Sequence, residues 1–185
     1  MSVLLPIIVL ILVALIIFVI AIYNGLVTSR NQVHSAWAQI DVELQRRFDL
    51  IPNLVETVKG YMKHEESVLT QVTDLRSAWG NAQTVAEKAK LENQLAGALK
   101  SIIAVAEQYP ELKANTNFLS LQEELSNTES KIASSRASYN NMVTVYNTKL
   151  EIFPNSIIAG MFNFKSEDLF KLENEEVKQN IKVSF

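Results

Sequence analysis

The 185-residue sequence contains no cysteine. Disulfides, thiolate metal sites, a cysteine nucleophile and a lipid-modified cysteine are therefore excluded, and the redox compartment is left undecided. Glycine and proline are scarce as well, with five and four residues respectively. So few turn-forming residues are typical of long helices rather than of sheets, and we expect an all-α protein.

Positive charge is in slight deficit, because 17 lysines and arginines face 20 aspartates and glutamates, for a net charge of −3. The longest basic cluster is the pair Arg46-Arg47. A nucleic-acid-binding surface needs a basic patch or stripe, so we expect no nucleic-acid partner. The sequence also lacks a glycine-rich phosphate loop, a nucleophile elbow and a paired-carboxylate pattern, and we expect no enzymatic activity.

Charge is absent altogether between Val3 and Tyr23, an apolar run that only Pro6 interrupts. At about 1.5 Å per residue, this run forms a helix of roughly 31 Å, close to the ~30 Å hydrocarbon core of a bilayer. We expect a retained transmembrane anchor over residues 1–25. One alternative is a cleaved secretory signal, whose usual cationic start, shorter apolar region and small-residue cleavage site are not clear here. Another is an unusually apolar core helix.

Behind the anchor, apolar residues recur at spacings of three, four and seven, which predicts amphipathic helices. The predicted helices cover residues 26–48, 50–79, 82–109 and 117–152. Long helices with short joints match an antiparallel up-and-down bundle. We therefore assign residues 26–164 to one helical bundle and residues 165–185 to a loosely held tail. Trp37 and Trp79 are expected in or beside the apolar stripes.

The first joint of this bundle is predicted between residues 47 and 52. Asp49 is a candidate N-cap, and Pro52 would occupy the first turn of the next helix. The residue before a proline also avoids helical angles. An alternative keeps residues 26–79 as one kinked rod, which would leave half of its apolar stripe without a partner of similar length.

An apolar patch follows the last long helix, between Lys149 and Lys165. Its members are Phe153, Ile157, Ile158, Met161, Phe162 and Phe164. In an up-and-down bundle the last helix returns to the side where the anchor emerges. We therefore expect this patch at the membrane interface or against a neighbouring subunit; the alternative is that it caps the bundle core.

Two blocks of sequence resemble the bacterial LemA family. The first is RRFDLIPNLV at residues 46–55, which continues into VKGY at 58–61 and His64-Glu65. The second comprises Arg136, Tyr139-Asn140, Tyr146-Asn147, Phe153-Pro154 and Ile158-Ala159-Gly160. Two features depart from the family pattern: a serine-rich stretch before Tyr139, and Asn163 where a glycine between two phenylalanines is more typical. The resemblance implies a membrane-anchored helical bundle of the bacterial envelope, with no settled catalytic activity.

Polar residues in and near these blocks are the main site candidates. They are Arg46, Arg47, Asp49, Asn53, Arg136, Asn140 and Asn147. The last three share one helix face, because they are spaced by four and seven residues. One interpretation is a polar layer or turn clamp that fixes the helix register. The other is a binding site for a partner or a small ligand.

The two histidines, His34 and His64, are predicted on different helices. The sequence His64-Glu65-Glu66 does not favour a metal site, because adjacent helical residues diverge by about 100° and a metal pair needs a spacing of three or four. Glu123-Glu124 and Glu175-Glu176 are interpreted as solvated surface. We expect neither a metal nor another cofactor.

These observations favour a non-enzymatic, single-pass membrane protein whose bundle is a self-associating scaffold or interaction module. The alternative is a ligand-binding sensor or adaptor that regulates a membrane partner such as a protease. Expected partners are the lipid bilayer, further copies of the chain and, in the alternative, another membrane protein. We expect an inner-membrane location. Arg30 is the only cation close to the apolar run, so the positive-inside rule does not decide the side of the bundle, and we take the cytoplasm as the working expectation.

Overall fold

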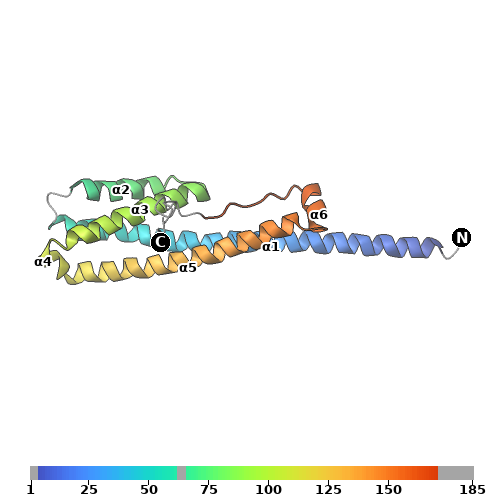
Figure 1. Cartoon of the computed structure of the whole chain (residues 1–185), viewed down its shortest axis with the longest axis horizontal. Coiled ribbons are helices and arrows are strands. Elements are labelled where there is room, and N and C mark those ends of the chain that lie inside the picture. Colours follow the sequence, from blue (N-terminus) through green and yellow to red (C-terminus); the bar gives the residue numbers. More distant parts are fainter. Residues whose placement is uncertain (1–3, 62–65, 171–185) are drawn as a thin grey trace, which may run out of the picture. The chain divides into compact units, whose positions relative to one another are not determined.

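The computed structural model describes residues 4–61 and 66–170, and every regular element in these ranges is a helix (Figure 1). The helices are α1 (Leu4–Lys59), α2 (Glu66–Trp79), α3 (Val85–Ala106), α4 (Pro110–Lys113), α5 (Thr116–Glu151) and α6 (Asn155–Met161). The predicted all-α class is confirmed.

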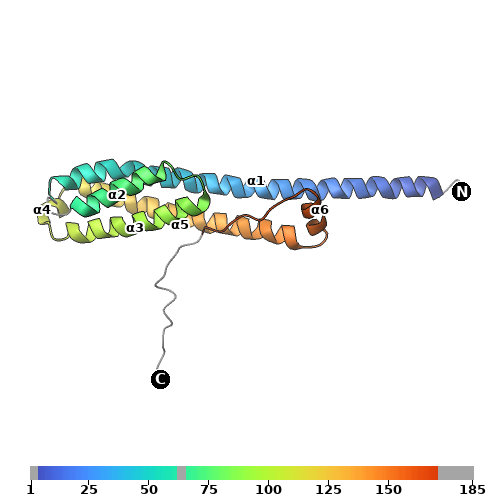
Figure 2. The same ribbon diagram turned by 90° about the horizontal axis from the view of Figure 1, so that it is seen from above.

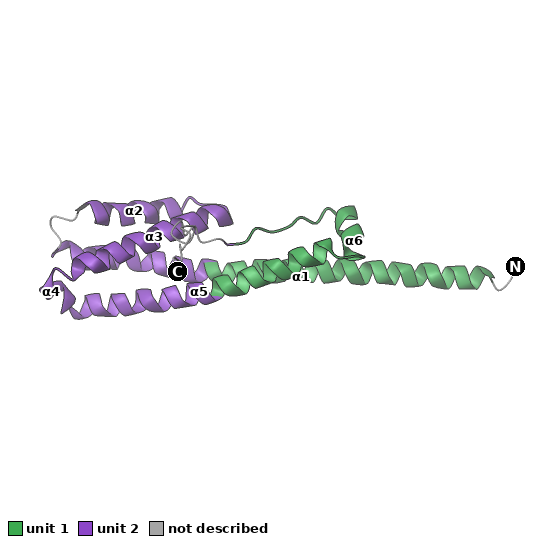
Figure 3. Cartoon of the chain, viewed as in Figure 1, with its two compact units in different colours: residues 1–40, 135–169 green, residues 41–134, 170–185 purple. Residues whose placement is uncertain are grey.

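The chain divides into two compact units (Figure 3). Unit 1 comprises residues 1–40 and 135–169, and unit 2 comprises residues 41–134 and 170–185. Helices α1 and α5 each contribute residues to both units.

Unit 2 contains the helical bundle. Its long members are the end of α1, all of α2 and α3, and the start of α5, and they run alternately up and down (Figure 2). Their inward faces form an apolar core in which the rings of Phe48 and Trp79 stack with centroids 4.5 Å apart. Other buried members are Leu44, Ile51, Leu54, Val58, Leu69, Val72, Leu95, Leu99, Ile102, Leu112, Phe118, Leu125 and Ile132. The predicted up-and-down arrangement is confirmed within this unit.

A capping box begins helix α3. The backbone N–H of Glu87 donates to Thr84 Oγ1 at 3.1 Å, and Glu87 Oε2 accepts from the backbone N–H groups of Gln83 and Thr84 at 3.0 and 3.1 Å. These two backbone donors, with the Thr84 hydroxyl, lower the pKa of Glu87. The box satisfies N–H groups that have no partner inside the helix, so it fixes where α3 starts.

The predicted turn at residues 47–52 is wrong, because α1 continues through it to Lys59 and carries Pro52 inside the helix. Proline in a helix interior costs about 3 kcal/mol. Phe48, Ile51 and Val58 are all buried along the same stripe, and burying a large apolar side chain contributes about 1.5–3 kcal/mol each. Continuous burial thus outweighs the local break signal.

The helix predicted for residues 50–79 is accordingly divided. Its first part is the end of α1, and its last part is α2. The backbone N–H of Tyr61 bonds to the carbonyl of Val58 at 3.0 Å in a turn that ends α1. The alternative of one kinked rod over residues 26–79 is correct in that the helix passes through residue 52. It is wrong in that α1 ends at Lys59 and does not reach residue 79.

Unit 1 contains the start of α1, the end of α5, helix α6 and the extended segment that follows α6. In the described part of the chain, α1 is the one helix long and apolar enough to cross a membrane; the mean hydropathy of its most apolar stretch is 3.6, and none of that stretch is buried. From Leu26 to Ile40, one face of α1 is buried instead. The candidate membrane span and the first helix of the bundle are therefore parts of one helix.

Both tryptophans lie in or beside the core, as expected. Trp79 is buried with only 6% of its surface exposed. Trp37 is half-buried in unit 1, where its ring meets the ring of Tyr139 edge-on at 5.7 Å.

Candidate functional site

The polar candidates divide between the two units. Arg46, Arg47, Asp49 and Asn53 belong to unit 2, whereas Arg136, Asn140 and Asn147 belong to unit 1.

A buried ion pair joins α1 to α3 in unit 2. Arg47 Nη1 lies 2.5 Å from Glu92 Oε1, and the two side chains are only 3% and 1% exposed. A second carboxylate, that of Glu129 on α5, lies 3.8 Å from Arg47 Nη2. Arg47 thus links three helices of the bundle, α1, α3 and α5.

The other polar candidates of unit 2 lie nearer the surface. Arg46 pairs with Glu124 of α5 at 3.1 Å in an exposed position, and Asp49 accepts a hydrogen bond from Gln45 at 2.9 Å. Asn53 is exposed and lines a shallow polar hollow together with Asn115. A further ion pair joins Lys88 to Asp41, and the Lys88 ammonium lies over the Trp79 ring at 4.9 Å. Arg46, Lys88 and Asp41 therefore add cross-links between helices.

Three side chains of α5 hold the segment that follows α6, and we call them the clasp. The hydroxyls of Tyr139 and Tyr146 donate to the carbonyls of Asp168 and Lys165 at 2.8 and 3.1 Å. Asn147 holds Glu167 twice, because its Nδ2 donates to the Glu167 carbonyl at 2.9 Å and its Oδ1 accepts from the Glu167 N–H at 3.0 Å. The clasp thus provides hydrogen-bond partners for backbone groups of an extended segment that is not part of a helix or a sheet.

The clasp tyrosines have altered acidity. Burial, followed by the nearby charges of Glu167 and Asp168, raises the pKa of Tyr139 to about 12. Burial also raises the pKa of Tyr146, although the positive charge of Arg30 acts in the opposite direction. Both phenols therefore remain donors at neutral pH. Arg136 and Asn140 are half-buried on the same helix.

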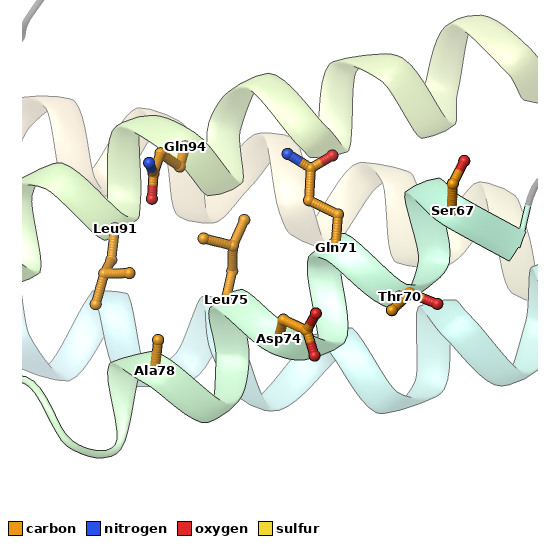
Figure 4. Close-up of a pocket in the computed structure, with 8 residues that line it drawn as sticks. All are labelled: Ser67, Thr70, Gln71, Asp74, Leu75, Ala78, Leu91 and Gln94. Atoms are coloured by element: carbon orange, nitrogen blue, oxygen red, sulfur yellow. The ribbon is translucent and has the colours of Figure 1, made fainter.

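An open groove lies between α2 and α3 in unit 2 (Figure 4). Leu75, Ala78 and Leu91 supply its apolar surface. Its polar members are Ser67, Thr70, Gln71, Asp74 and Gln94. The side chains drawn include neither a histidine nor a basic residue, so the groove offers apolar contact with polar edges.

Within the described residues, no group of three or more histidine, cysteine, aspartate and glutamate side chains could hold a metal ion. His34 is exposed and lies 3.6 Å from the carboxylate of Glu167. His64 and Glu65 fall outside the described residues.

The sequence reasoning missed Glu92 and the targets of the clasp. Glu92 could have been found, because it lies three residues from both Ala89 and Leu95 on the buried stripe of α3. A carboxylate on an apolar stripe points to a partner of opposite charge, because an unpaired buried charge is costly. The clasp targets are backbone groups, which carry no side-chain signal.

The fold of residues 4–61 and 66–170 defines a class: a helical protein with one helix long and apolar enough to cross a membrane. The chain belongs to the LemA family, whose model matches residues 36–185. The resemblance found in the sequence is thereby confirmed. Family membership and the candidate span together indicate a membrane-associated protein.

The individual relatives have low sequence identity to this chain, but the matches cover most of its length. Protein LemA of Metamycoplasma hominis is 25% identical over 154 residues, covering 83% of this chain and 70% of the relative. Magnetosome protein MamQ 2 of Paramagnetospirillum magneticum is 26% identical over 175 residues, covering 80% of this chain and 64% of the relative. Magnetosome protein MamQ of Magnetospirillum gryphiswaldense is 26% identical, with coverage of 86% and 68%. The matched regions span 64–70% of these relatives' lengths.

The buried ion pair generates a stability prediction. Glu92→Gln removes the nearer and buried carboxylate partner of Arg47, and breaking a buried pair typically costs about 3–5 kcal/mol. Replacing both residues, in Arg47→Met with Glu92→Leu, should recover most of this loss because no buried charge remains. Urea unfolding of the full chain in detergent measures both free energies.

The neighbouring arginine supplies the matched control. Arg46→Met removes an exposed pair and should change the free energy of unfolding by less than about 1 kcal/mol. Equal losses for Glu92→Gln and Arg46→Met would contradict the clamp.

The raised pKa of Tyr139 predicts alkaline instability. Below about pH 10 both folded and unfolded states keep the phenol proton, so the free energy of unfolding is unaffected. Between about pH 10 and about pH 12 the unfolded state releases the proton while the folded state retains it, so stability should fall as pH rises. Thermal unfolding from pH 9 to pH 12 measures this slope. Tyr139→Phe should make it shallower; a slope equal to that of the unsubstituted chain would refute the assignment.

Proposed function

We propose that the chain is a non-enzymatic, single-pass membrane scaffold whose helical bundle self-associates. The supporting observation is that the buried polar candidates bind other parts of the chain. Arg47 pairs with Glu92, and Tyr139 and Asn147 hold backbone groups of the segment after α6. Because these side chains are used for contacts within the fold, the observation favours a structural role over a catalytic one.

The membrane anchor favours association between copies of the chain. A tether confines copies to the plane of the membrane and raises their local concentration, so weak contacts suffice for assembly. The bundle offers apolar side chains for such contacts: Val42 on α1 is 66% exposed and Leu119 on α5 is 47% exposed. Long helices can pair between copies through such positions in the manner of a coiled coil.

The location is part of the proposal. We place the anchor in the inner membrane of a bacterial cell, with the bundle in the cytoplasm. The candidate span and the family membership support a membrane location. A protease-protection assay on spheroplasts reports the side.

The alternative function is a sensor or adaptor that binds a soluble ligand or regulates a membrane partner such as a protease. The groove between α2 and α3 favours it, because Leu75 and Leu91 present apolar surface flanked by polar side chains. In this case the bundle would be monomeric until the ligand or partner binds.

The mass of the full chain in detergent distinguishes the two functions. A scaffold should give an oligomer by light scattering that persists on dilution, and Val42→Asp should shift it towards the monomer because it places a charge in the contact. Gln39→Asp, on an exposed polar position of the same helix, should leave the mass unchanged. A chain that stays monomeric at every concentration would contradict the scaffold.

A further inference from the structure

We propose that α6 and the turn before it form a second membrane contact, in which Phe153, Ile157 and Met161 insert into the boundary between headgroups and acyl chains beside α1. This contact goes beyond the scaffold function and does not depend on it. The occupant of the surface is the lipid bilayer.

One face of α6 is docked on α1 within unit 1. Ile158 and Ala159 are buried against Leu26. Val19, Ile22, Tyr23, Leu150 and Phe164 pack around this cluster. The Tyr23 ring lies 4.8 Å from the ring of Phe162 and 5.7 Å from that of Phe164. Ile158 therefore anchors α6, contrary to the expectation that it belongs to the outward-facing patch.

The opposite face of α6 and the preceding turn are apolar and uncovered. Phe153 is 81% exposed, Met161 71% and Ile157 55%. Ile152 and Phe162 are also about half exposed. Side chains of the span itself, such as Ile17 and Phe18, are exposed to a similar degree. Clustered exposure of this kind marks an interaction surface rather than a helix end in water.

The docking site sets the depth of this patch. The apolar part of α1 from Leu4 to Tyr23 is about 30 Å long at 1.5 Å per residue, which matches the hydrocarbon core. Tyr23 therefore lies at the end of the span, where aromatic residues favour the interface. Because α6 packs on Val19, Tyr23 and Leu26, it is level with this boundary. Its uncovered side chains then continue the lipid-facing surface of α1.

The helix end explains how the chain returns to α1. Asn163 has a φ of 55°, in the left-handed region that favours glycine but tolerates asparagine. The N–H of Phe164 bonds to the carbonyl of Ala159 at 2.9 Å, and that of Asn163 to the carbonyl of Gly160 at 3.3 Å, which is a Schellman motif. Asparagine thus fulfils the role of the glycine expected from the family pattern. The motif directs the Phe164 ring back onto Tyr23.

Cations accompany the patch on the water side. The Arg30 guanidinium lies 5.3 Å from the centre of the Phe164 ring, and Lys149 Nζ lies 2.6 Å from Ser29 Oγ. Lys165 follows the patch, and Glu151 is the only acidic residue between Ser130 and Ser166 in the sequence. Arginine and lysine beside an apolar surface suit lipid headgroups. This charge pattern favours a bilayer over a second protein surface.

The absence of cysteine allows a direct test by site-directed spin labelling. Single-cysteine variants Phe153→Cys and Met161→Cys of the full chain are labelled with a nitroxide and reconstituted in vesicles of phosphatidylcholine with phosphatidylglycerol. Collision with oxygen, which concentrates in lipid, is compared with collision with a water-soluble nickel complex. We expect both labels to favour oxygen. Val145 is an exposed apolar position on α5, eight residues before Phe153 and so about 12 Å away along a helix axis. A label at Val145→Cys should collide more often with the nickel complex than with oxygen.

Three results would overturn the proposal. Labels at 153 and 161 that collide with nickel as often as the label at 145 would place the patch in water. Spin–spin broadening that disappears on dilution with unlabelled chain would show that a second copy covers it. Labels immobilised and inaccessible to both reagents would show that the patch is buried in the chain's own core.

Discussion

Helix α1 changes along one continuous backbone from a surface that is apolar on every side to a single apolar face, and the remaining structure depends on this constraint. Its first twenty or so residues are apolar on every side, and a helix satisfies their backbone groups without water. From Leu26 onward only one face is apolar, and that face requires cover. Helix α6 and the end of α5 cover it in unit 1, and α2, α3 and the start of α5 cover it in unit 2. The bundle is therefore the partner that the second part of α1 needs.

Apolar packing alone has little directional preference. Polar side chains add directional contacts between particular helices and segments. A buried arginine without a partner of opposite charge is costly, so the contact of Arg47 with Glu92 favours the arrangement of α1 and α3 in which these two side chains meet. The clasp acts on the backbone, since Tyr139, Tyr146 and Asn147 bind carbonyl and N–H groups that an extended segment leaves open. The two clasp tyrosines lie seven residues apart on α5, and that spacing keeps both on one face of the helix.

Periodicity was enough to predict the helical class, the stripes of α3 and α5 and the apolar helix, because each depends on side-chain pattern within one segment. The predicted turn at Pro52 is wrong because the apolar stripe that continues from Phe48 to Val58 outweighs the local break signal of the proline. The polar candidates were recognised by type, but their partners were not, since Glu92 and the backbone of Glu167 lie far away in sequence. Likewise, the patch at residues 153–164 was identified as apolar, whereas its division into a docked face and an open face required the packing of Ile158 on Leu26.

The continuity of α1 through Pro52 is the central claim, and the distance between residues 42 and 56 tests it most directly. Both positions are exposed, and cysteines introduced there would be the only ones in the chain. A continuous helix separates them by about 21 Å, from 14 steps of 1.5 Å. Pulsed electron paramagnetic resonance on the doubly labelled full chain should give a distribution centred near that value. A distribution centred near 10 Å, the spacing of adjacent antiparallel helices, would show a hairpin and contradict the account.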